Sequence, residues 1–146
     1  MTAAADPDRR VALALVILRC AVASVFVIHG LGRWALDLVA PFAGYFAAHG
    51  VPAPAVWPWV VTVIEVAGGV LLAVGVGVRP LTAWFALQIL VGIATIHAPA
   101  GWFVVGAGRN GMEYSALIVV CLLVTWLTAD LAPGLGGKKA PAKAGA

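Results

Sequence analysis

Two histidines and two glutamates fall near the ends of apolar segments of the chain. His29 and His97 close two such segments, whereas Glu65 lies inside another and Glu113 enters a fourth. Imidazole and carboxylate groups can accept and release protons near neutral pH when their surroundings favour it. We therefore predict that these four residues are the catalytic groups of a buried polar site.

Three more residues could bind a polar or anionic substrate beside them. Arg19 interrupts the first apolar segment, and Arg109 and Asn110 come shortly before Glu113. A guanidinium group forms strong hydrogen bonds with anions, so Arg109 is expected to hold one, such as an oxidised sulfur species. Arg19 is expected to form a buried ion pair with Glu65 and to set its charge balance. No histidine or cysteine has metal-ligand spacing, and no metal site is predicted.

Each group also has a purely structural interpretation. The pair of Arg19 and Glu65 could do no more than fix the register of two helices. His29 and His97 could be histidines at the membrane interface. Asn110 could cap a helix, with Glu113 reaching back to its backbone.

The composition indicates that these residues are positioned by a membrane protein. Of the 146 residues, 63% are hydrophobic and 10% charged, and the mean hydropathy is +1.04, whereas soluble domains are about half apolar and a quarter charged. The lipid bilayer is therefore the expected surroundings. The basic residues do not alternate with aromatic ones, so a nucleic-acid partner is not expected.

Four apolar segments predict an all-α, four-transmembrane-helix bundle with spans at 11–28, 59–78, 81–96 and 112–131. The prolines and glycines between 31 and 58 exclude a span there and favour a short interfacial helix over 39–48. The domain prediction is a cytoplasmic tail at 1–10, one membrane domain at 11–131 and a flexible cytoplasmic tail at 132–146. A signal peptide cleaved near Ala23 is the alternative interpretation of the first span. Cys20 and Cys121 are expected to be buried, inert thiols.

The distribution of basic residues predicts that both termini are cytoplasmic. On the predicted inner side are Arg9, Arg10, Arg79, Lys138, Lys139 and Lys143. Only Arg33 and Arg109 fall on the outer side. The tryptophans predict two aromatic belts, with Trp34, Trp57, Trp59 and Trp102 outside and Trp84 and Trp126 inside.

Small residues follow Glu65 at four-residue spacing. Gly69, Ala73 and Gly77 share its stripe of the predicted helix. Such a stripe lets a neighbouring helix approach closely, so Glu65 is expected to face the bundle interior.

With these residues in place, the chain resembles the DoxX family of small four-span bacterial and archaeal membrane proteins. The likeness covers most of 11–128. It rests on Arg19, Phe26, His29 and Gly30, on Gly50-Val51-Pro52, on Ile64-Glu65-Val66-Ala67-Gly68-Gly69 with Leu72, Gly75 and Arg79, on His97-Ala98-Pro99 and Gly101-Trp102-Phe103, and on Asn110-Gly111-Met112-Glu113-Tyr114.

The resemblance implies a multi-pass protein of the cytoplasmic (inner) membrane that is related to subunits of quinol oxidases and of thiosulfate:quinone oxidoreductases. The leading hypothesis is a membrane subunit of a quinone-linked redox complex whose polar site contacts a quinone. No haem, iron–sulfur or flavin motif occurs, so no cofactor is expected within the chain. A redox partner subunit or a second copy of the chain is the expected partner. The alternatives are a non-catalytic anchor or assembly factor and, last, a transporter of protons or small solutes.

Overall fold

The computed structural model describes residues 6–132 and Gly134, and within them every regular element is a helix. The elements are α1 (Pro7–Ala35), α2 (Val39–Ala48), α3 (Trp57–Val63), η1 (Ile64–Gly68), α4 (Gly69–Ala73), α5 (Val78–Gly92), η2 (Ile93–His97), α6 (Ala98–Ala100) and α7 (Glu113–Leu127). The two η segments are π-helical turns inside longer helices. The prediction of an all-helical protein is confirmed.

Two continuous helices are long and apolar enough to cross a membrane, namely Pro7–Ala35 and Val78–Ala100. Only 22% and 11% of their most apolar windows are buried within the protein, whereas the core helix of a soluble domain is mostly buried. Their exposed apolar surface is therefore suited to lipid. Trp57–Ala73 and Glu113–Leu127 are shorter apolar helices of the same structure.

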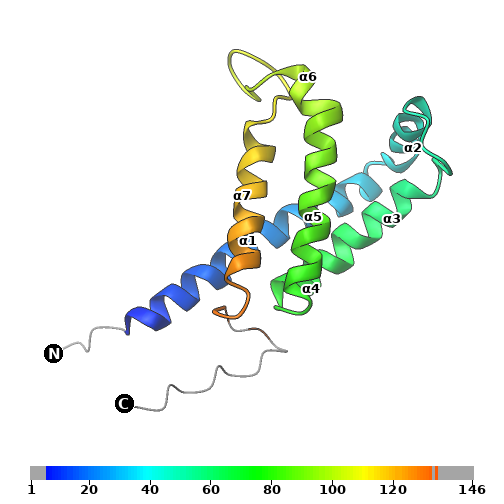
Figure 1. The fold of residues 1–146 in the computed structure, drawn as a ribbon. Helices are drawn as coiled ribbons and strands as arrows, with labels where there is room; N and C mark the ends of the chain where they lie inside the picture. Colours follow the sequence, from blue (N-terminus) through cyan, green and yellow to red (C-terminus); the bar gives the residue numbers. More distant parts are fainter. Residues whose placement is uncertain (1–5, 133, 135–146) are drawn as a thin grey trace.

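The helices pack as two layers that cross (Figure 1). α5 and α7 run side by side, and α1 crosses them at an angle while it packs against α3, η1 and α4. The start of α1 and the end of α7 lie on one side of the molecule, and α2 and α6 lie on the other. A stacked pair of rings joins the layers, because the centroids of Phe26 in α1 and Phe85 in α5 are 4.0 Å apart.

The observed helix ends explain which residues can reach the interior. α1 begins at Pro7, where the side chain of Asp6 accepts a hydrogen bond from the backbone of Asp8 (3.1 Å). It continues to Ala35, seven residues beyond the predicted end of the first span, and so carries Arg33 within its last turn. α2 has the predicted bounds, 39–48.

Two glycines allow α1 to approach the helix that carries Glu65. A Cβ added to Gly69 would lie 2.6 Å from Val27 of α1, and one added to Gly30 would lie 2.9 Å from Val66. Neither distance leaves room for a side chain. The predicted close packing along the small stripe is confirmed, and Glu65 faces the interior with no exposed surface.

Three smaller expectations have different outcomes. Cys20 is exposed, although its sulfur lies 3.7 Å from the carbonyl oxygen of Ala73, so it is not the buried thiol that was predicted. Trp84 packs against the hydrophobic core and is half-buried, so it differs from the exposed tryptophans of an interfacial belt. Of the predicted tail at 132–146, Pro133 and residues 135–146 lie outside the described residues.

Candidate functional site

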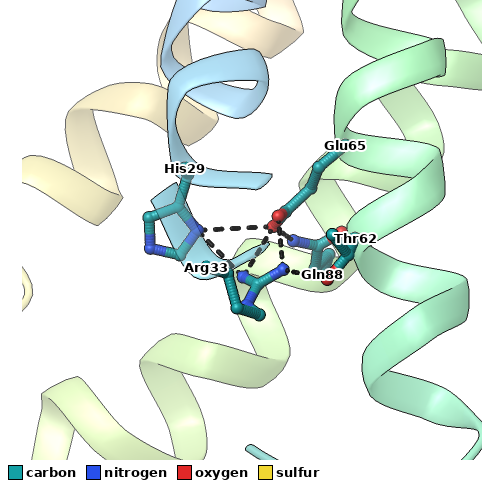
Figure 2. A network of polar contacts seen from close by, with 5 residues as sticks. All are labelled: His29, Arg33, Thr62, Glu65 and Gln88. Carbon is teal, nitrogen blue, oxygen red and sulfur yellow. Dashed lines mark hydrogen bonds and ion pairs between the residues drawn. The ribbon is translucent and has the colours of Figure 1, made fainter. Parts of the chain in front are cut away.

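Five polar side chains meet between α1, the helix of α3 and η1, and α5 (Figure 2). His29 and Arg33 come from α1, Thr62 and Glu65 from the second helix, and Gln88 from α5. We call these five residues the Glu65 cluster.

An ion pair that uses both carboxylate oxygens forms the centre of the cluster. Nη1 of Arg33 lies 2.6 Å from Oε2 of Glu65, and Nη2 lies 3.3 Å from Oε1. Gln88 donates a further hydrogen bond to Oε1, and Nη1 of Arg33 donates to the hydroxyl of Thr62 (3.0 Å). Glu65 and Arg33 are 0% and 8% exposed. A buried pair with this many hydrogen bonds compensates much of the cost of removing two charges from water.

Helical spacing explains why these residues meet. His29 and Arg33 are four residues apart, and Thr62 and Glu65 are three apart, so each pair shares one face of its helix. Glu65 also lies in the π-helical turn η1, a kind of widened turn that occurs often at functional sites. Gly30 brings the two faces together, since a Cβ there would lie 3.0 Å from that of Glu65.

His29 connects the buried pair to the outside of the protein. Its Nδ1 lies 3.0 Å from Nη2 of Arg33 and 3.5 Å from Oε1 of Glu65. Its side chain is nevertheless 70% exposed, whereas that of Glu65 is 1% exposed. One ring nitrogen therefore belongs to the cluster, and the rest of the ring is open to the surroundings.

The short helix α2 covers the cluster at the end of α1. The ring of Phe42 lies against the guanidinium of Arg33, with 4.7 Å between Cζ and the ring centroid. Phe46 packs beside Phe42 with its centroid 4.7 Å away, and Tyr45 stacks on His49 at 4.1 Å. This aromatic layer shields Arg33 from the aqueous side of α2.

The predicted partner of Glu65 was wrong: Arg33 takes the place expected for Arg19. Nη1 of Arg19 donates instead to the carbonyl oxygen of Ala132 (3.1 Å), and its guanidinium lies beside Gly75 in the turn between α4 and α5. Gly30, which packs on Glu65, is eleven residues further along α1, or about 16 Å. Arg19 is therefore buried at the opposite end of the bundle, where substrate binding together with Glu65 is not possible.

His97, Asn110 and Glu113 form a second polar group, near α6. Nδ1 of His97 lies 2.9 Å from the carbonyl oxygen of Asn110, and Glu113 accepts a hydrogen bond from the backbone of Val104 (2.9 Å). His97 is nine residues beyond Gln88 on the same helix, or about 13 Å. The structure thus divides the predicted site in two, with His29 and Glu65 in one part and His97 and Glu113 in the other.

The predicted capping interaction of Asn110 and Glu113 was also wrong. The residue before α7 is Met112, which makes no side-chain cap, and Asn110 is in the left-handed region with φ at +60°. Glu113 binds Val104 because the loop folds back: Gly111 and Glu113 donate backbone hydrogen bonds to Phe103 and Trp102. Arg109 is exposed on this loop.

Sequence reasoning missed Arg33, Thr62 and Gln88 as members of the site. Each had a signal, however. Arg33 follows His29 at i+4, Thr62 precedes Glu65 at i−3, and Gln88 is an amide inside an apolar segment, where a polar group needs a partner. The early predicted end of the first span removed Arg33 from consideration.

Comparison with known proteins supports one family. A family model described as DoxX matches residues 14–98, which include every member of the Glu65 cluster. No curated protein and no solved structure matches the chain. Across residues 6–132 and 134, no group of three or more His, Cys, Asp or Glu side chains is placed to hold a metal ion.

Proposed function

Because this chain belongs to the DoxX family, we propose that it is a membrane subunit of a quinone-linked redox complex in which His29 contacts the quinone headgroup. The observation that carries the proposal is the position of His29. The side chain is 70% exposed beside the lipid-facing Ile28, yet its Nδ1 contacts the buried pair of Arg33 and Glu65.

The proposed topology is four spans in the bacterial or archaeal cytoplasmic membrane, with both termini cytoplasmic. Trp57–Ala73 and Glu113–Leu127 have lengths of about 25 and 22 Å, and local thinning of a bilayer core of about 30 Å can accommodate them. Arg79 pairs with Asp130 beyond α7, so the basic start of α5 lies at the same end as Arg9 and Arg10 of α1. Arg33 at the other end is neutralised by Glu65, which strengthens the positive-inside bias.

The direction of access favours a lipid-soluble substrate. Phe42 covers Arg33 at the end of α1, and the side chains of Glu65 and Arg33 are 1% and 9% exposed. Within the cluster only His29 is largely exposed, between Val25 and Ile28, which are themselves 43% and 68% exposed. A ligand therefore reaches the cluster from the side, through lipid, as a quinone would.

The two ring nitrogens of His29 allow it to serve both forms of the quinone. When Nδ1 accepts from Arg33, the proton is on Nε2, which can donate a hydrogen bond to a quinone carbonyl oxygen. When Nδ1 is protonated and turned to Oε1 of Glu65, Nε2 is free to accept a proton from a quinol hydroxyl. Oxidation of the quinol releases two protons and two electrons; His29 takes one proton, and a partner subunit with a redox cofactor takes the electrons.

A second candidate is a non-catalytic anchor or assembly factor. The observation in its favour is that Arg33, Thr62, Glu65 and Gln88 bind one another and join three helices without an external ligand. Glu65→Gln in the native complex separates the candidates. The redox proposal expects an assembled complex with reduced quinol turnover, whereas an assembled complex with unchanged turnover contradicts it; failure to assemble supports the anchor.

Quinone contact is tested with the purified protein in lipid nanodiscs and decylubiquinone, followed by quenching of tryptophan fluorescence. His29→Phe keeps an aromatic ring at an exposed position and removes both nitrogens. We expect a Kd about tenfold higher, equivalent to one hydrogen bond of about 1.4 kcal/mol. His97→Phe is the matched control and should leave Kd unchanged. Equal binding by the His29 variant and the wild type refutes the proposal.

A further inference from the structure

An open pocket of about 420 Å³ lies at the end of α1, separate from the Glu65 cluster. Trp34 and Asp37 line it on the side of α1, and Trp59 lines it from the first turn of α3. Small residues of α2 and of the segment before α3, Ala40, Ala43 and Ala55, complete its wall. The pocket therefore combines two indole rings, one carboxylate and a wall of methyl groups.

This combination is suited to an ammonium group. Indole faces attract cations, and several aromatic rings around a site are the usual means of binding ammonium compounds. Asp37 adds a negative charge, and across residues 6–132 and 134 no ion pair neutralises it. Trp34 and Trp59 are 63% and 52% exposed, so both rings are available to a ligand.

The level of the pocket indicates where such an ammonium group comes from. Residues 11–31 of α1 extend over about 30 Å, the thickness of a bilayer core. Trp34 and Asp37 follow directly, at the depth of the lipid headgroups. The neighbours of Asp37 in the connection to α2 are Leu36 and Leu38, which are 69% and 46% exposed and can contact acyl chains.

We infer that this pocket binds the ammonium group of a phosphatidylethanolamine headgroup, with Asp37 as the counter-charge and the two indoles around it. The site shares no residue with the Glu65 cluster and does not depend on quinone binding. It does contact α2, since Ala43 in the pocket wall follows Phe42, which covers Arg33. A bound headgroup therefore holds α2 in place over the cluster.

The test compares lipids of equal acyl chains by native mass spectrometry of the full-length protein. Wild-type protein should retain phosphatidylethanolamine about fivefold better than phosphatidylglycerol, which has no ammonium group. Asp37→Asn should abolish this preference. Asn suits the left-handed backbone of position 37, where φ is +54°, so the variant removes the charge and preserves the fold. Trp59→Leu should weaken retention as well.

Asp8→Asn is the control, because Asp8 is an exposed acid in the first turn of α1, at its other end. It should behave as wild type. The inference is overturned if phosphatidylglycerol is retained equally well, or if Asp37→Asn keeps the preference. Free ethanolamine should not compete at millimolar concentration; competition would mean that the pocket takes a soluble amine and would overturn the assignment to a lipid.

Discussion

The two ends of α1 each bury an arginine, and the two arginines are used differently. Arg33 meets a carboxylate, and its charge is balanced by Glu65 through two oxygens. Arg19 donates to a backbone carbonyl, that of Ala132, beside the turn at Gly75. The same residue type thus builds a polar site at one end and fastens a chain segment at the other. Burial of a charge inside a helix bundle therefore does not by itself identify a functional site.

The largest expected effect comes from removing the carboxylate. Glu65→Ala leaves the guanidinium of Arg33 buried without its counter-charge, which should cost about 3–5 kcal/mol of unfolding free energy. The measurement is a reversible SDS titration of the purified protein. The double variant Arg33→Met with Glu65→Leu should recover most of the loss, because well-packed apolar residues can replace a buried pair. A double variant as unstable as the single one contradicts this account.

Arg19→Met should have a smaller effect of a different kind. It removes a charged donor from the carbonyl oxygen of Ala132, which should cost about 2–3 kcal/mol in the same titration. Quinone binding should not change, because the Glu65 cluster is about 16 Å away along α1. Altered quinone affinity in this variant would show that the two ends are coupled and would remove the contrast between them.

A pair of glycines in α1 sharpens the comparison further. Gly30→Ala places a methyl group 3.0 Å from Cβ of Glu65 and should cost about 1–2 kcal/mol while it weakens quinone binding. Gly32→Ala is the control two residues away, where a Cβ meets nothing within 4 Å. Thermal unfolding of both variants checks the difference. Equal midpoints would show that the close approach at Gly30 is not required.

The smallest effect is expected at the surface near Arg19. Arg79 and Asp130 are 2.5 Å apart, but their side chains are 51% and 75% exposed. Asp130→Asn should therefore cost only about 0.2–1 kcal/mol, and less at high salt. Thermal unfolding in low and high salt measures it. A loss as large as that of Glu65→Ala would mean that exposure does not separate the two ion pairs.

The sequence predicted the elements better than their relative rotation. The bounds of α2, the all-helical class and the inward direction of Glu65 follow from local patterns such as prolines, apolar periodicity and the small residues after Glu65. The partner of Glu65 depends on how far α1 continues and which of its faces meets η1. The first span was expected to end at Ile28, so Arg33 was assigned to a connection and Arg19 took its place.

The loop before α7 shows a second limit. His97 and Glu113 are close to the same end of the bundle as His29, which suggested one site. The chain between them folds back on itself through backbone hydrogen bonds, such as the one from Met112 to the carbonyl oxygen of Gly101 (3.0 Å). These bonds turn both side chains toward the loop. Such tertiary pairing has no periodic signal in a single sequence.

The π-helical turn η1 also makes the chain length of this segment critical. A π turn contains one residue more than the α turn that would replace it. Deleting a residue between Ile64 and Gly68 would restore α geometry and rotate everything after it by about 100° relative to what comes before. Thr62 and Gly69 could then no longer both face α1. Insertions and deletions in η1 are therefore expected to be tolerated far less than conservative replacements of its apolar side chains.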